Sequence, residues 1–229
     1  MLYPKMNRSR TIVDLGGIWK FKLGDETEPG ESWTELQDAD TIYVPASFND
    51  QKEDPAYRNH YGWVYYERAV ELPVCLCTEQ NRQVLRFDAV IYINSKLAST
   101  HTGGFLPFEV DITDLLPADG RLTIGVAADN RVSHSTLPVG NEDSIAFFGS
   151  DNPGIPSVEA AKKWRKKQNM PNFDFFNFAG INRPVRIYST PVSYIEDITL
   201  VPSLEGDTGV LNYKITTAGV GSDAPVTLK

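Results

Sequence analysis

Cysteine is scarce in this 229-residue chain, which contains only Cys75 and Cys77. So few cysteines exclude a small scaffold held together by several disulfides. If the two lay on a strand, both would point to one face, and a disulfide between such close neighbours would be strained. No further zinc ligand stands nearby in the sequence. We therefore expect both to be buried thiols in a reducing compartment, and we expect the protein to be cytoplasmic.

Histidine is almost as rare, with three copies at His60, His101 and His134. They show no H-x-x-x-H spacing and no carboxylate at a metal-binding interval, so loop or packing roles are expected for them. The sequence accordingly predicts no metal site and no cofactor.

Long apolar runs are also missing. No stretch approaches the ~20 apolar residues that a membrane-spanning helix needs. Residues 1–10 contain no apolar segment of signal-peptide type, so no signal peptide is expected. The net charge of −8 and the pI near 4.9 argue against a general nucleic-acid binder, which would carry a basic face. We expect neither a membrane nor a nucleic-acid partner.

Helical periodicity is nearly absent, and what replaces it is alternation with a period of two. A single short helix is expected at Val158–Lys167, with Ser157 as its N-cap. Alternating or β-rich runs separated by turn residues predict strands within 15–23, 42–44, 62–72, 84–90, 91–94, 108–112 and 122–128. Many short strands with hardly any helix predict an all-β sandwich.

A domain boundary is expected near Pro191. Beyond it, residues 194–201 and 210–216 are predicted strands joined by a turn at 207–209. The segment 191–229 is too short to close a seven-stranded immunoglobulin-like sandwich. We therefore expect one domain at 1–190 and only part of a second domain at 191–229.

The stretch Asp174–Val185 organises the rest of the sequence. Four of the six residues from Phe173 to Phe178 are aromatic, which is more apolar area than an isolated loop would expose. The loop is therefore expected to pack against the protein and to hold Asp174 and Asn177 in fixed directions. Two interpretations stay open: a well-packed corner of the sandwich, or a rigid polar tip aimed at a ligand.

Other polar and aromatic residues have mainly structural interpretations. Glu109 and Asp111 share one strand face, which predicts a solvated surface. Trp63 is expected in the core, although a tryptophan can also stack on a sugar. The basic run Lys162–Lys167 allows three interpretations, namely a solvated helix end, electrostatic attraction of an anionic substrate, or nucleic-acid contact.

Several runs, taken in order, resemble a known family. The most specific are SFND (Ser47–Asp50) and DFFNFAGI (Asp174–Ile181). Together with the runs 15–21, 58–66, 85–90 and 101–109, they resemble the N-terminal sugar-binding domain of glycoside hydrolase family 2, in its β-glucuronidase branch.

The resemblance implies a galactose-binding-like jelly roll, then the start of an immunoglobulin-like sandwich, and in the full enzyme a catalytic (β/α)8 barrel. Such enzymes cleave β-D-glucuronides with retention, using two glutamates about 5–5.5 Å apart. Neither family motif for those glutamates occurs in this chain, so no catalytic residue is assigned. Glu142, in Asn141-Glu142-Asp143, lacks the family's Asn-Glu-Pro pattern and is expected to be a solvated loop acid.

One functional residue transfers with the resemblance. In β-glucuronidases, the aspartate of the Asp-Phe-Phe-Asn run reaches the mouth of the barrel and binds a hydroxyl of the sugar, and here that residue is Asp174. A carboxylate suits this task because charge-assisted hydrogen bonds to hydroxyls are short and directional.

Two functions from different classes therefore stand. The first is the non-catalytic N-terminal portion of a β-glucuronidase, whose partners in the full enzyme are the β-glucuronide and the missing barrel. The second is a free-standing carbohydrate-binding module without hydrolase activity. The incomplete second domain favours the first, and the sequence leaves open whether the full enzyme is a homo-oligomer.

Overall fold

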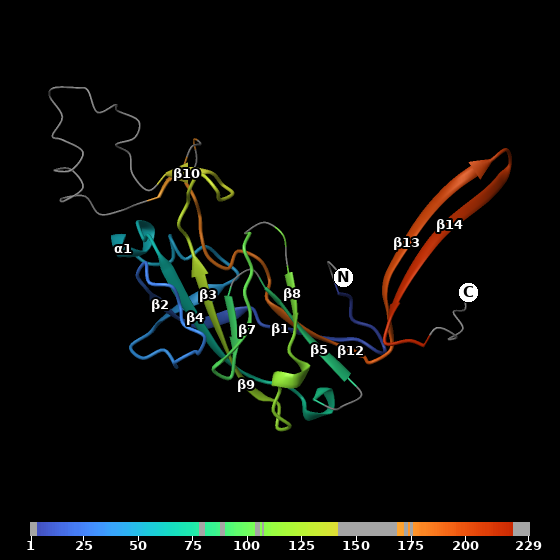
Figure 1. Ribbon diagram of the computed structural model, residues 1–229, viewed down its shortest axis with the longest axis horizontal. Helices are drawn as coiled ribbons and strands as arrows, with labels where there is room; N and C mark the ends of the chain where they lie inside the picture. Colours follow the sequence, from blue (N-terminus) through green and yellow to red (C-terminus); the bar gives the residue numbers. More distant parts are fainter. Residues whose placement is uncertain are drawn as a thin grey trace.

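A computed structural model describes residues 4–77, 81–87, 90–103, 106, 108–141, 169–171, 174 and 176–221. Within these ranges the protein consists mainly of antiparallel strands, and the all-β prediction is confirmed (Figure 1). The helix expected at Val158–Lys167 lies outside the described residues. None of the helices that the structure describes is long and apolar enough to cross a bilayer.

Two antiparallel sheets form the sandwich. The larger sheet has the order β3-β2-β4-β9-β6-β7 and the smaller the order β1-β12-β5-β8. The larger sheet contains β2 (Gly17–Leu23), β3 (Asp40–Val44), β4 (Trp63–Glu71), β6 (Val90–Ile93), β7 (Lys96–Ser99) and β9 (Arg121–Asp129). The smaller sheet contains β1 (Thr11–Asp14), β5 (Asn81–Phe87), β8 (Phe108–Asp111) and β12 (Arg186–Pro191). Because neighbouring strands are often distant in sequence, the chain crosses repeatedly between the sheets, as in a jelly roll.

The core lies between the sheets and follows from the alternation of each strand. In β2, Trp19 and Phe21 are almost fully buried, whereas Ile18 is 63% exposed. In β9, Leu122, Ile124 and Val126 are buried on the core face. Burying a large apolar side chain contributes about 1.5–3 kcal/mol relative to leaving it in water, so this periodicity orients both strands.

A second, smaller cluster covers the outer face of the larger sheet. Residues 24–39, here called the outer strap, connect β2 with β3 and pass the β6–β7 turn, where the Trp33 amide donates to the Ser95 carbonyl at 3.1 Å. Trp33 lies so close to Gly125 that a Cβ there would be 2.3 Å from the indole. Trp63 packs in this cluster rather than between the sheets, and it is buried as expected.

The buried carboxylate of Glu67 anchors the outer strap. Glu67 is only 3% exposed. Its Oε2 accepts from the Trp33 indole N–H at 2.8 Å and from the Leu36 amide at 3.0 Å, and its Oε1 accepts from Lys20 at 2.9 Å. Burial opposes ionisation of Glu67, but the Trp33 and Lys20 hydrogen bonds outweigh it, and its pKa is lowered.

Residues 51–60 are rich in charged side chains, which predicts a surface segment, and one helical turn lies within them. Helix α1 (Pro55–Arg58) begins after Asp54, whose carboxylate caps the Ala56 amide at 2.8 Å. Tyr57 is buried, with its ring centroid 5.5 Å from that of Phe21. The surface expectation is therefore wrong at Tyr57, because one apolar residue per turn is enough to fasten so short a helix to the core.

The two cysteines lie on a 3-10 turn and not on a strand. This turn, η1 (Val74–Leu76), follows Pro73, which ends the preceding extended run. Cys75 is exposed and Cys77 is half-buried, and neither forms a disulfide. The expectation of two buried thiols is thus wrong, since the turn directs Cys75 away from the core. A second 3-10 turn is η2 (Thr113–Leu115).

A long two-stranded ribbon follows the sandwich and projects away from it (Figure 1). It consists of β13 (Tyr194–Glu205) and β14 (Thr208–Ala218). The turn lies at Gly206 and Asp207, one residue earlier than predicted, because Gly206 adopts the left-handed φ of +61° that a tight hairpin needs. The assignment of two domains at 1–190 and 191–229 stays a prediction.

The faces of this ribbon differ in polarity. Directly opposed pairs on one face are apolar: Ile198 with Ile215, Leu200 with Tyr213, and Pro202 with Leu211. On the other face, Thr199 opposes Lys214 and Val201 opposes Asn212. Within the described residues the apolar face stays open, and Leu200, Leu211 and Tyr213 are each 55% exposed.

Candidate functional site

Three segments meet around the stretch that the sequence analysis singles out. They are the turn after β3 (residues 45–50), helix α1, and residues 174 and 176–183, which we call the Asp174 loop. The Phe48 amide donates to the Ala179 carbonyl at 3.2 Å, and the Ala46 amide donates to the Ile181 carbonyl at 2.9 Å. These backbone bonds attach the base of the Asp174 loop to the turn in a ladder-like arrangement.

Asn49 links all three segments through one side chain. It is 2% exposed. Its Oδ1 accepts from the Ala179 amide at 2.8 Å and from the Ser47 hydroxyl at 3.0 Å. Its Nδ2 donates to the carbonyls of Tyr57 at 3.3 Å and Arg58 at 3.2 Å. Rotating the amide by 180° would place donor against donor at Ala179, so the backbone groups around Asn49 determine its orientation.

Aromatic packing fixes the other side of the Asp174 loop. The Arg58 guanidinium lies 4.4 Å from the centre of the Phe176 ring and forms an ion pair with Asp50. The ring centroids of Phe176 and Phe178 are 4.8 Å apart. Phe176 is half-buried, but Phe178 remains 49% exposed, so packing covers only part of this aromatic surface. Phe173 and Phe175 lie outside the described residues.

Gly180 allows the loop to turn into the core. Its φ is +112°, and a Cβ at this position would be 2.6 Å from the Tyr66 hydroxyl oxygen and 3.1 Å from the Phe48 ring. Burial raises the pKa of Tyr66 far above its usual value, so this phenol stays neutral. The next residue, Ile181, is 3% exposed and belongs to the core. Only a residue without a side chain fits between the loop and Tyr66.

Asp174 itself is exposed, whereas Asn177 is half-buried. The loop therefore has a fixed base and carries a carboxylate at the surface. Such a carboxylate can accept short hydrogen bonds from hydroxyl groups. The role of Asp174 as a sugar contact stays a prediction.

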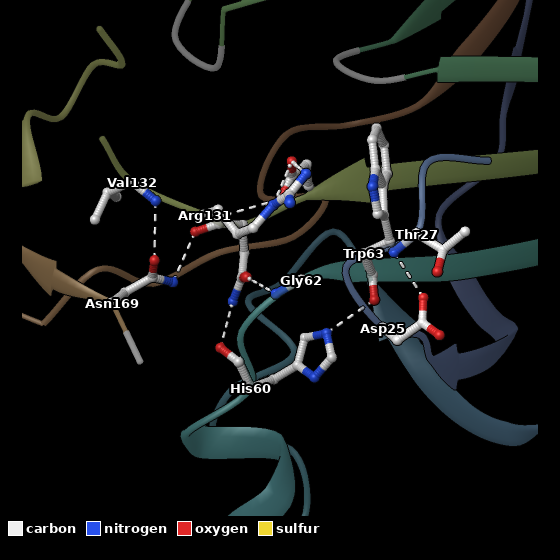
Figure 2. Close-up of polar contacts among 10 residues, drawn as sticks. Asp25, Thr27, His60, Gly62, Trp63, Arg131, Val132 and Asn169 are labelled. Carbon is white, nitrogen blue, oxygen red and sulfur yellow. Dashed lines mark hydrogen bonds and ion pairs between the residues drawn. The ribbon is translucent and has the colours of Figure 1, made fainter. Parts of the chain in front are cut away.

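A second polar cluster ties neighbouring loops together and is shown in Figure 2. The Asn130 Oδ1 accepts from the Gly62 amide at 2.9 Å, and its Nδ2 donates to the His60 carbonyl at 2.8 Å. The Asn169 side chain donates to the Asn130 carbonyl at 2.7 Å and accepts from the Val132 amide at 2.9 Å. The cluster uses both ends of each carboxamide for backbone groups, so its role is to hold the loops.

His60 has a packing role in this region. Its Nε2 lies 2.8 Å from the Trp63 carbonyl (Figure 2), and its ring lies edge-on to Phe48 at 6.0 Å. Burial lowers the pKa of His60, which favours a neutral ring with Nε2 as the donor. His101 also packs, since it stacks on Phe108 with ring centroids 4.4 Å apart.

Glu109 and Asp111 are both exposed on one face of β8, as the sequence predicts. The Tyr188 hydroxyl donates to Glu109 at 2.9 Å. Both acids line a pocket of about 180 Å³ where the ribbon leaves the sandwich, and its other lining residues are Arg10, Val84, Tyr188, Tyr194 and Glu196. The prediction of a solvated face is confirmed, and this exposed face also forms part of the pocket beside β13.

The remaining predictions fall on positions that are not described. Glu142 and the basic run Lys162–Lys167 lie outside the described residues. Asn49 and Arg58 both lie in the sequence motifs of the family, but no role was predicted for either residue. The only available signal was an amide residue directly after the aromatic Phe48 in a turn-rich run, which does not reveal partners more than a hundred positions away.

Two facing antiparallel sheets with jelly-roll connections, followed by a strand ribbon, define a β-sandwich of the kind found in non-catalytic sugar-binding domains. The family model described as glycosyl hydrolases family 2, sugar binding domain, matches residues 12–191. The chain therefore belongs to glycosyl hydrolase family 2, and the matched residues are its sugar-binding domain. The family prediction from the sequence is confirmed.

The chain is similar to β-glucuronidases from bacteria and from humans. The β-glucuronidase of Faecalibacterium prausnitzii is 51% identical, with a TM-score of 0.83, over 96% of this chain and 37% of that chain. The Bifidobacterium dentium β-glucuronidase, solved with coumarin-3-O-glucuronide, is 44% identical, with a TM-score of 0.83, over 96% of this chain and 38% of that chain. Human β-glucuronidase is 36% identical over an alignment of 239 positions. The alignment covers 96% of this chain and 35% of the human protein. The chain spans about a third of the length of these relatives.

Proposed function

We propose that this chain is the N-terminal part of a β-glucuronidase, an enzyme that hydrolyses β-D-glucuronides with retention. The observation that carries the proposal is the 51% identity to the Faecalibacterium prausnitzii β-glucuronidase across 96% of the chain. The substrate class follows from the relatives, since the Bifidobacterium dentium protein was solved with a glucuronide.

In this proposal the bond-breaking step belongs to a barrel that follows the described residues. Retaining glycosidases need two carboxyl groups about 5–5.5 Å apart, one as acid and base and the other as nucleophile. The contribution of this chain is to orient the sugar. The Asp174 carboxylate would accept hydrogen bonds from sugar hydroxyls, and the anchored loop would keep it in place before the substrate arrives.

The ribbon favours this proposal over a free-standing carbohydrate-binding module. A two-stranded hairpin is marginal by itself, and a contiguous apolar face normally packs against something. The open face around Leu200, Leu211 and Tyr213 fits further strands of a second sandwich. A gene that encodes these strands and then a barrel with two glutamates would support the enzyme.

The test of the substrate contact is Asp174→Ala in the full-length protein. Losing a hydrogen bond to a charged group should lower kcat/KM for an aryl β-glucuronide by about 1.5–3 kcal/mol, or roughly 10- to 150-fold. If the Asp174 hydrogen bond strengthens as the sugar ring distorts towards the transition state, the variant should have a lower kcat as well as a higher KM. The melting temperature should hardly change, because the side chain is exposed.

Asp174→Asn is the matched variant, because it keeps the size and one acceptor but removes the charge. Its loss of kcat/KM should be smaller than that of Asp174→Ala. A lowered melting temperature with unchanged kcat/KM in the folded enzyme would mean that Asp174 only braces the loop.

A further inference from the structure

The Asn49 side chain occupies an unusual place in the site. It joins three segments, and its bond to the Ala179 amide spans 130 positions of the sequence. We propose that Asn49 is a positioning residue, whose carboxamide fixes the Asp174 loop in the direction that the sugar contact requires. This inference rests on the proposed function, and it adds a residue to which neither the family resemblance nor the comparisons assign a role.

The contacts of Asn49 act on both sides of the loop. Through Oδ1, Asn49 holds the backbone of the loop at Ala179. Through Nδ2, it holds the end of α1 at the Tyr57 and Arg58 carbonyls. Arg58 in turn lies over Phe176, two residues from Asp174. One buried amide therefore links the backbone of the loop to the helix whose Arg58 contacts Phe176.

Other bonds secure the base of the loop without Asn49. The Ala46 amide binds the Ile181 carbonyl, the Phe48 amide binds the Ala179 carbonyl, and Ile181 is buried in the core. Removing the Asn49 side chain should therefore leave the base attached while the tip gains freedom. A misplacement of ~1 Å at a contact can cost up to about a hundredfold in rate, so a loosened tip should be visible in catalysis.

The experiment compares four variants of the full-length protein: Asn49→Ala, Asn49→Asp, Asp174→Ala and the double variant Asn49→Ala/Asp174→Ala. We expect Asn49→Ala to lower kcat/KM for an aryl β-glucuronide by about tenfold, mostly through kcat. Asn49→Asp keeps the acceptor for the Ala179 amide and should recover part of the loss. The double variant should match Asp174→Ala alone, because a positioning residue has no effect once the positioned group is gone.

Asn130→Ala is the matched control. Asn130 is also a buried asparagine that holds two backbone groups, but its bonds go to His60 and Gly62 and not to the Asp174 loop. The Asn130→Ala change should lower the melting temperature about as much as Asn49→Ala does. Its kcat/KM should stay within about twofold of that of the unmodified enzyme. Hydrogen exchange of a peptide covering residues 174–181 should speed up in Asn49→Ala and not in Asn130→Ala.

The outcomes separate this inference from the proposed function. If Asp174→Ala lowers kcat/KM but Asn49→Ala does not, positioning by Asn49 is wrong and the sugar contact stands. If the losses add in the double variant, or if Asn130→Ala lowers kcat/KM equally, Asn49 does not act through Asp174. If Asp174→Ala has no effect, the proposed sugar contact fails, and positioning for that contact fails with it.

Discussion

Gly180 shows how one residue determines the path of a functional loop. The loop approaches the Phe48 backbone and the Tyr66 hydroxyl, then enters the core at Ile181. The approach is possible because Gly180 combines a φ of +112° with the absence of a Cβ. A polar tip at Asp174 and a buried anchor at Ile181 can therefore be separated by only a few residues.

Gly180→Ala should destabilise the protein by about 2–4 kcal/mol, from backbone strain at positive φ together with overpacking against Tyr66. The measurement is the free energy of unfolding in denaturant. Gly30→Ala is the control, because a Cβ at Gly30 would have no atom within 4 Å and its φ is ordinary. That change should stay within about 0.5 kcal/mol. Equal stability of the two variants would contradict the role assigned to Gly180.

Among the elements, the outer strap depends on a single ionised carboxylate. Trp33 and Leu36 both donate to Glu67, and without this acceptor the strap would leave one buried and one partly buried donor unsatisfied. The folded-state pKa of Glu67 is lowered. Ionised Glu67 therefore stabilises the fold at pH values above the usual pKa of a glutamate, which is about 4.3–4.5. This contribution is lost as the pH falls through the lowered pKa.

Glu67→Gln should therefore change the pH dependence of stability. At neutral pH it should cost about 1–3 kcal/mol, since an amide replaces a charged acceptor. The difference from the unmodified protein should be constant above about pH 5 and should shrink towards acid pH. Denaturant midpoints between pH 7 and 3 measure this. Glu35→Gln, which alters an exposed partner of Lys20, should show neither effect.

In the ribbon of β13 and β14, the apolar residues on one face predict that further strands pack against it. Leu200 and Val201 are adjacent and almost equally exposed, at 55% and 54%, but they lie on opposite faces. Their environments should differ only when further strands cover the apolar face.

Leu200→Asp should lower the stability of the full-length protein by about 2–4 kcal/mol, because an unpaired charge would be buried. Val201→Asp should have little effect, because it faces solvent on the polar side. In the chain of residues 1–229 alone, both substitutions should be tolerated. Thermal denaturation of the four proteins measures this, and equal effects in the full-length protein would mean that the apolar face stays uncovered.

At the scale of the whole molecule, the described residues form a sandwich that carries the Asp174 carboxylate on a loop. They contain no barrel. The chain of residues 1–229 alone should therefore hydrolyse no aryl β-glucuronide, because catalysis needs both an acid and a nucleophile. It should also show no measurable glucuronate affinity at millimolar concentration, since one carboxylate supplies few of the contacts that a sugar needs. Turnover that scales with purified chain concentration would contradict this prediction.

Local patterns were enough to predict the family and most of the long strands, but not short strands such as β1 and β7. Alternation in β2 and β9 identifies the buried face, because a strand places every second side chain on one side. The motifs around Ser47–Asp50 and Asp174–Ile181 led to the same family as the match over residues 12–191. A short apolar run is more ambiguous, and for this reason Cys75 and Cys77 were expected to be buried although Cys75 lies on an exposed 3-10 turn.

Tertiary structure alone decided which distant groups meet. Nothing near Asn49 in the sequence indicates that its partner is the Ala179 amide, and nothing near Glu67 indicates that it binds Trp33. Tyr57 is buried only because α1 lies against Phe21. Periodicity follows from the geometry of a single strand, whereas a buried polar group must find its partner wherever folding leaves an unsatisfied donor or acceptor. That choice is made by the packing of the two sheets and their loops.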